Sequence, residues 1–215
     1  MNIEQTRDWM INHQVRPWNV VDPKVLHTLG EIKREAFVPE HYRALAFADT
    51  EIPLPAGQKM LKPVVEGRLL QALDLDNHHQ VLVVGTGSGF FTALAARIAH
   101  HVTAIDLHEE LTNYAETKLA LDRTGNVDLH TADFATWQPD KRFDRIVLTG
   151  GLPQFDARLP EWLNEGGVAI APLGAAPNME VERLTRTDES YTRESLFETV
   201  LPELQNVSIQ PTFRF

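Results

Sequence analysis

The stretch VLVVGTGSGF, residues 81–90, places four apolar residues directly before a loop with glycine at every second position. Short apolar runs of this kind are typical of strands buried in a parallel sheet. Glycine adopts positive φ readily, and because it has no Cβ a ligand can approach its main chain closely. We therefore expect a buried strand, a ligand-binding glycine loop and a helix that begins near Phe90.

The sequence beyond this stretch repeats the same rhythm. Short apolar runs occupy residues 102–105, 145–148 and 168–171, and helical patterns occupy residues 90–101 and 109–123. Buried runs joined by helices favour a Rossmann-like α/β fold, with a mostly parallel central sheet and helices on both faces. The helix over 109–123 is expected to end because of Gly125.

Residues 1–76 have a different character, since helical patterns there are interrupted by proline and no strand-like block appears. Asp22 and Pro23 form a good helix start, with Asp as N-cap and Pro in the first turn. A second helix is predicted over residues 63–73. Residues 49–62 contain two prolines and a glycine, which predicts a structured loop without a regular element.

Two antiparallel strands are expected near the C-terminus, over residues 181–187 and 196–201, and residues 212–215 alternate like an edge strand. We interpret residues 1–215 as a single domain. In it a helical N-terminal cap, residues 1–76, lies on an α/β core, residues 77–215.

Composition narrows the function. The 215 residues contain no cysteine and carry a formal net charge of -10. The lack of cysteine excludes disulfides, thiolate zinc sites and cysteine nucleophiles. The nine histidines show no chelating spacing, so no metal site is predicted. The acidic balance disfavours nucleic acid as a partner, because polyanion binding needs a basic surface.

No apolar run approaches the ~20 residues that a helix needs to cross a bilayer, so no membrane partner is expected. The N-terminal residues lack the apolar region of a signal peptide, which favours a cytoplasmic location. The sequence does not indicate an oligomeric state.

Acidic residues near the strand ends indicate what the glycine loop binds. Asp106 follows Gly85 by 21 residues, a spacing at which a carboxylate reaches a ribose diol. Asp133 follows a predicted third strand, residues 127–131, where it can meet an adenine edge. A dinucleotide fingerprint would need glycine where Phe90 stands, so the loop suits S-adenosyl-L-methionine better. The alternative is a sheet protein in which the loop binds no ligand and the glycines only shape a turn.

The chain also resembles the protein-L-isoaspartate O-methyltransferase family. In the cap, REAFVP at residues 34–39 is similar to the family's arginine-containing segment with its FVP turn, and AFAD at 46–49 to its AYxD. Gly57 and Gln58 fall on the family's GQ. In the core, residues 81–90 are similar to VLEIGTGSGY, and NEGGVAIAPLG at residues 164–174 is similar to KPGGRLVIPVG.

The resemblance implies a methyltransferase that uses S-adenosyl-L-methionine to methylate the free carboxylate of isoaspartyl residues in damaged proteins or peptides. The donor-binding residues that it assigns are Gly85, Thr86, Gly87, Ser88, Gly89, Asp106, Leu107, Asp133 and Phe134. The acceptor-side residues are Gln58, Lys59 and Leu61, the last at the position of a family serine. Lys59 and Lys62 would attract an anionic acceptor.

The sequence departs from the family mainly on the acceptor side. Leu61 replaces the serine, Val83 replaces a glutamate, and residues 199–202 lack the arginine of the family's VRFVPL segment. Two alternatives therefore stay open. One is a methyltransferase of the same fold with a different acceptor, and the other is a non-catalytic S-adenosyl-L-methionine-binding protein with a regulatory role.

Overall fold

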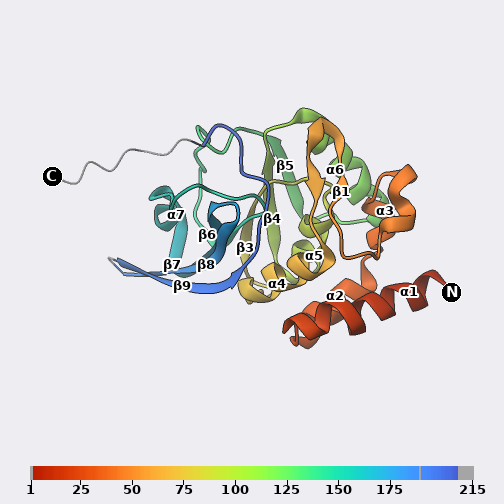
Figure 1. Cartoon of the computed structure of the whole chain (residues 1–215). Helices are drawn as coiled ribbons and strands as arrows, with labels where there is room; N and C mark the ends of the chain where they lie inside the picture. Colours follow the sequence, from red (N-terminus) through yellow and green to blue (C-terminus); the bar gives the residue numbers. More distant parts are fainter. Residues whose placement is uncertain (1, 189, 208–215) are drawn as a thin grey trace.

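The computed structural model describes residues 2–188 and 190–207, which contain a central seven-stranded sheet (Figure 1). From one edge to the other its strands are β5 (Val127–Thr131), β4 (His101–Asp106), β3 (Gln80–Val84), β6 (Phe143–Leu148), β7 (Leu163–Ala175), β8 (Asn178–Thr187) and β9 (Ser190–Glu198). The pairs from β5 to β7 are parallel, and β8 and β9 add antiparallel strands. The predicted mostly parallel Rossmann-like sheet is confirmed.

The apolar strand residues alternate between two hydrophobic clusters, because successive side chains of a strand point to opposite faces. Val81 and Val83 of β3 belong to one cluster, while Leu82 and Val84 belong to the other. The first cluster includes residues of α4 (Pro63–Leu73), α5 (Phe90–Ile98) and α6 (Glu109–Asp122). The second is closed by the short helix α7 (Arg158–Glu161) and by loops.

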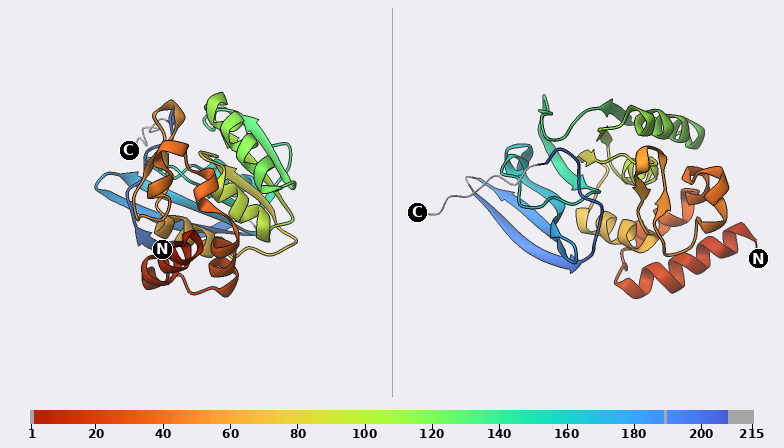
Figure 2. Two further views of the ribbon diagram at one scale, coloured as in Figure 1. Left: turned by 90° about the vertical axis from the view of Figure 1, so that its right-hand side faces the viewer. Right: turned by 45° about the horizontal axis from the view of Figure 1, so that its top comes forward.

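The N-terminal part forms a cap of short helices (Figure 2). It consists of α1 (Ile3–Met10), the π-helical turn η1 (Ile11–Val15), η2 (Arg16–Trp18), α2 (Pro23–Glu31), α3 (Arg34–Phe37) and η3 (Glu40–Leu45). The Asp22 side chain accepts from the Lys24 amide at 2.8 Å, which confirms the predicted cap of α2. Both figures show α1 and α2 at the opposite end of the molecule from β9.

One buried guanidinium joins this cap to the core. Arg34 is fully buried; its Nε donates to the Ala46 carbonyl at 2.8 Å and its Nη2 to the Leu61 carbonyl at 2.7 Å. Its Nη1 makes an ion pair with Glu66 of α4. The guanidinium carbon also lies 5.0 Å from the ring centre of Phe90, the first residue of α5. Arg34 thus contacts the cap, the loop before α4, α4 itself and the helix that follows the glycine loop.

Both side chains of this ion pair are buried away from water. Burial raises the pKa of Glu66 to about 8, although the charge and the hydrogen bond of Arg34 act in the opposite direction. Burial likewise lowers the pKa of Arg34, against the attraction of Glu66. Both groups are therefore costly to leave without a partner.

One predicted helix end is wrong, and a second is near its predicted place but has a different cause. The helix over 90–101 stops at Ile98, because His101 is already in β4, where it pairs in register with Gln80. The helix over 109–123 does end near its expected boundary, but the left-handed residue that terminates it is Arg123, with φ 63°, instead of Gly125.

The strand predictions also need correction. Residues 49–62 contain a two-residue ladder in which β1 (Ile52–Pro53) pairs with β2 (Lys59–Met60), on either side of the tight turn η4 (Pro55–Gly57). Residues 199–201 lie beyond the end of β9, and β9 begins earlier than expected, at Ser190. The predicted edge strand 212–215 lies outside the described residues. Across the described part, none of the helices is long and apolar enough to span a membrane.

The burial of Arg34 leads to a prediction about the free energy of unfolding. Arg34→Leu should lower the free energy of unfolding by about 3–5 kcal/mol, because it leaves Glu66 and two carbonyls buried without their donor. Urea unfolding would measure this loss. Arg193→Leu is the matched control, since Arg193 pairs with Glu182 at the surface, where an ion pair contributes only about 0.2–1 kcal/mol. Equal losses in the two variants would contradict a special role for Arg34.

Candidate functional site

A hollow lies at the carboxyl ends of the parallel strands, where β3, β4 and β5 each continue into a loop. Its lining brings together eight of the predicted site residues: Gln58, Lys59, Gly85, Gly87, Asp106, Leu107, Asp133 and Phe134. Ligands of open α/β sheets bind at this edge, next to the point where the strand order reverses. Here that point is β3, which pairs with β4 on one side and with β6 on the other.

The glycine loop has the backbone that the sequence predicted. Gly85, Gly87 and Gly89 have φ values of 91°, 54° and 82°, a region that side chains with a Cβ rarely adopt. A Cβ on Gly85 would lie 2.3 Å from the Thr149 hydroxyl, and one on Gly89 would lie 3.0 Å from Ala115. The loop is therefore fixed by packing from behind as well as by its own conformation.

Asp106, the last residue of β4, holds this loop from below. Its Oδ2 accepts from the Gly87 amide and its Oδ1 from the His108 amide, each at 3.0 Å. The residue is 7% exposed and lines the hollow. A carboxylate has lone pairs left after two such bonds, so Asp106 can accept further hydrogen bonds from a ligand diol.

The opposite side of the hollow is the turn that follows β5. Phe134 is nearly buried, and Asp133 accepts from the Ala135 amide at 2.9 Å through Oδ1. Its Oδ2 accepts from the Asn206 side chain at 2.8 Å. Asn206 belongs to the segment after β9, and the neighbouring residues 202–205 line the hollow too. The C-terminal segment therefore closes one side of this space.

That segment also narrows the hollow. The cavity volume of the hollow is about 90 Å³, whereas sites for small ligands usually measure ~300–1,000 Å³. The segment is held by main-chain bonds in which the Gly151 amide donates to Pro202 and the Leu204 amide donates to Gly151, both at 2.9 Å. The hollow is therefore smaller than such sites usually are.

On the acceptor side, Gln58 and Lys59 border the hollow and Leu61 does not. The Lys59 ammonium lies 2.7 Å from Glu51 Oε2, and the lysine side chain is 52% exposed. The Leu61 side chain belongs to the first hydrophobic cluster, and its carbonyl accepts from Arg34. Its predicted place beside the acceptor stays a prediction, with the side chain packed in the core.

Three further predicted donor residues, Thr86, Ser88 and Gly89, belong to the loop without lining the hollow. The Thr86 hydroxyl is buried without a hydrogen-bond partner in the described part of the chain. The positive-φ glycines Gly85 and Gly87 and the carboxylates of Asp106 and Asp133, which do line the hollow, form a set of groups that fits S-adenosyl-L-methionine.

Sequence reasoning missed several residues that line the hollow, including the following two contributors. Thr149, directly after β6, lines the hollow and donates to the Gly85 carbonyl at 2.6 Å. Residues 202–205 are the other contributor. The only signal for Thr149 was its place after an apolar run. No local sequence signal placed residues 202–205 there, because they reach the hollow from the far end of the chain. Among residues 2–188 and 190–207, no group of three or more His, Asp or Glu residues is placed to hold a metal ion.

Comparison with known proteins connects this geometry with a family. The sequence model of protein-L-isoaspartate(D-aspartate) O-methyltransferase matches residues 5–201. A protein-L-isoaspartate O-methyltransferase of Rhodopseudomonas palustris is 37% identical over 190 residues, 87% of each chain. Another such enzyme, from Pelobacter propionicus, is 33% identical over 198 residues, 91% of this chain and 88% of its own.

Solved structures support the fold. A candidate protein-L-isoaspartate O-methyltransferase of Plasmodium falciparum, solved with S-adenosyl-L-homocysteine, superposes with a TM-score of 0.79 at 17% identity over 95% of this chain and 99% of its own. A tRNA (m1A58) methyltransferase from Aquifex aeolicus reaches 0.51 at 19% identity over 69% of this chain and 70% of its own. The likeness to the first structure extends over nearly the whole chain, cap included.

The contacts of Asp106 with the glycine loop lead to a prediction about ligand binding. Asp106→Ala should weaken binding of S-adenosyl-L-homocysteine by ~1–3 kcal/mol, because a charged acceptor for ligand hydroxyls and for the Gly87 amide is lost. Isothermal titration would measure the change. Asp128→Ala is the control, since Asp128 is an exposed strand carboxylate that pairs with His101 and does not line the hollow. Unchanged affinity in a folded Asp106→Ala variant would refute the ribose assignment.

Proposed function

The chain belongs to the protein-L-isoaspartate(D-aspartate) O-methyltransferase family, and from that premise we propose that it methylates the free carboxylate of isoaspartyl residues in proteins and peptides. Its methyl donor is S-adenosyl-L-methionine, which supplies a methyl group on a positively charged sulfur. One observation carries the proposal. Six of the nine donor-side residues and the acceptor-side pair Gln58 and Lys59 line a single hollow.

The acceptor itself removes the need for a catalytic base. A carboxyl group with a pKa near ~4 is ionised at neutral pH and is already nucleophilic. The protein has to bring the two reactants together in the right orientation, which can contribute roughly 7–11 kcal/mol. We therefore assign no general base among the residues that line the hollow.

The roles of the lining residues follow from their positions. The backbone of Gly85 and Gly87 would face the amino-acid end of the donor, Asp106 with Leu107 its ribose, and Asp133 with Phe134 its adenine. Thr86, Ser88 and Gly89 would act through the shape of the loop.

Lys59 is the best candidate for holding the acceptor. In the free protein its ammonium is paired with Glu51, and an acceptor carboxylate can take the place of that partner. Such an exchange is cheap, because a surface ion pair contributes only about 0–1 kcal/mol. Gln58 can add a neutral hydrogen bond to the same group.

The wider setting belongs to the proposal as well. We place the enzyme in the cytoplasm, acting on proteins and on neither nucleic acid nor membranes, which the net charge of -10 supports. The cap with its substrate loop, residues 1–76, would work as one domain with the core, residues 77–215. The Arg34 guanidinium supports this association, because its hydrogen bonds and ion pair hold residues 1–76 together while it packs on the ring of Phe90 in the core.

Methyl transfer to matched peptides tests the function. At saturating donor, labelled methyl groups should pass to a peptide with one isoaspartyl residue and not to its aspartyl twin. The Leu61→Ser variant should be assayed beside the wild type, since it restores the family's hydroxyl at a core position. If the wild type binds donor and modifies neither peptide, the isoaspartyl assignment fails and a different acceptor or a silent binding role takes its place.

The role of Lys59 makes a separate prediction. Lys59→Gln should raise the KM for the isoaspartyl peptide about tenfold or more, because a charged hydrogen bond contributes about 1.5–3 kcal/mol where it is formed. The KM for the donor should stay unchanged. Lys62→Gln is the matched control, an exposed lysine three residues away that does not line the hollow. Equal effects of the two variants would show a general attraction for anions in place of a specific contact.

A further inference from the structure

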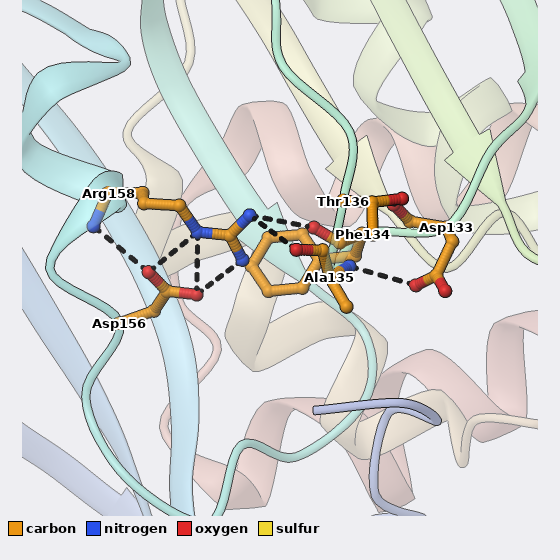
Figure 3. A network of polar contacts seen from close by, with 6 residues as sticks. All are labelled: Asp133, Phe134, Ala135, Thr136, Asp156 and Arg158. Atoms are coloured by element: carbon orange, nitrogen blue, oxygen red, sulfur yellow. Dashed lines mark hydrogen bonds and ion pairs between the residues drawn. The ribbon is translucent and has the colours of Figure 1, made fainter. Parts of the chain in front are cut away.

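The turn that follows β5 is held from outside the donor site by one arginine (Figure 3). Arg158 is the first residue of α7, and its Nη1 donates to the carbonyls of Phe134 at 3.1 Å and Ala135 at 3.0 Å. These two carbonyls are consecutive, so a single guanidinium nitrogen fixes the path of the main chain between them. Arg158 does not line the donor hollow. It borders a different groove on the other side of the turn.

The same guanidinium is fixed on its far side by a carboxylate. Nε donates to both oxygens of Asp156, at 3.0 and 3.2 Å, and Nη2 donates to Oδ2 at 2.6 Å. Oδ1 of Asp156 also accepts from the Arg158 amide at 2.9 Å. A planar, forked pair of this kind is stronger and more directional than an ordinary ion pair. Arg158 is therefore a rigid bridge from Asp156 to the turn.

Arg158 also packs on the ring whose position matters for the hollow. Its guanidinium carbon lies 4.8 Å from the ring centre of Phe134 and 5.1 Å from that of Trp162. The two rings meet edge to face, with centres 5.6 Å apart. Phe134 is thus held through its carbonyl and through its ring, and it lines the hollow where we place the adenine.

The charge state of the pair supports a permanent brace. Burial raises the pKa of Asp156, but the hydrogen bonds and the charge of Arg158 outweigh that effect and lower it overall. Asp156 is therefore ionised at neutral pH. With side-chain exposures of 25% and 19%, Arg158 and Asp156 are sheltered but not sealed from water.

The turn transmits this constraint to Asp133. The Asp133 carbonyl accepts from the Trp137 amide at 2.8 Å, and its carboxylate accepts from the Ala135 amide at 2.9 Å. Ala135 therefore donates to Asp133 through its amide while its carbonyl is held by Arg158. Figure 3 shows the Asp133 carboxylate at one end of this chain of contacts and the Asp156–Arg158 pair at the other.

We propose that Arg158, braced by Asp156, is a positioning residue for the methyl donor: it sets the turn that presents Asp133 and Phe134 to the adenine end. The proposal rests on the proposed placement of the donor in the hollow. It assigns Arg158 no contact with the donor, the acceptor or the methyl group.

Titration of the free protein with S-adenosyl-L-homocysteine tests the proposal without any acceptor. Arg158→Gln should raise the dissociation constant about tenfold, and Arg158→Lys should give an intermediate value, because one ammonium keeps the charge but cannot bridge the carbonyls and the carboxylate together. With an acceptor peptide, the KM for the donor should rise in parallel, while the KM for the peptide and kcat at saturating donor stay unchanged.

Arg193→Gln is the matched control. Arg193 borders the same groove, pairs with Glu182 and lies 4.8 Å from the Phe155 ring, but makes no contact with the turn. Its donor affinity should equal that of the wild type. Thermal unfolding of each variant separates a loss of affinity from a loss of folded protein.

A folded Arg158→Gln variant with donor affinity within twofold of the wild type would overturn the proposal. If Arg158→Gln does not fold, Asp156→Asn decides, since it removes only the charge of the brace. We expect it to weaken donor binding about threefold, and unchanged binding would overturn the proposal equally. A wild-type protein that binds no S-adenosyl-L-homocysteine would instead refute the donor placement, and one that binds it without modifying isoaspartyl peptide would refute only the acceptor.

Discussion

The buried guanidinium of Arg34 is the interaction on which the arrangement of the N-terminal segments, and their contact with α5 of the core, depends. Its donors are divided between the carbonyls of Ala46 and Leu61 and the carboxylate of Glu66, three groups from different parts of the chain. Because the guanidinium is planar, these partners must keep a fixed geometry relative to one another. The acceptor loop that ends at Leu61 is thereby held at a set distance from the donor loop, whose helix begins under the same arginine.

In the donor site, too, buried or sheltered side chains hold main-chain groups in place. Asp106 holds the glycine loop through the Gly87 amide, Thr149 holds it through the Gly85 carbonyl, and Arg158 holds the turn that carries Phe134. Each of these contacts is made to main chain. A site whose ligand-facing parts include main chain and an aromatic ring needs such support, because looseness of about 1 Å is enough to lose function.

The sequence predicted those parts that depend on local pattern. The apolar runs indicated the parallel strands, the glycine spacing indicated the positive-φ loop, and the distance from Gly85 located Asp106 at the end of β4. The contacts that join distant segments had no local signal. Glu66 lies 32 residues from Arg34, and Asn206 lies 73 residues from Asp133. Helix ends also escaped prediction where strand pairing overrode them, as at His101.

The position of Leu61 bears on how the acceptor is recognised. A serine there would offer a hydroxyl, but the leucine side chain is packed in the core, and its contribution to order in the loop comes through its carbonyl. Under the proposed function, recognition of a carboxylate falls to groups that border the hollow, among which Lys59 carries a positive charge. An ionised acceptor needs a partner of opposite charge more than it needs a hydroxyl, because charge-assisted hydrogen bonds are roughly twice as strong as neutral ones. Loss of the serine is therefore compatible with transfer to a carboxylate as long as Lys59 can exchange Glu51 for the substrate.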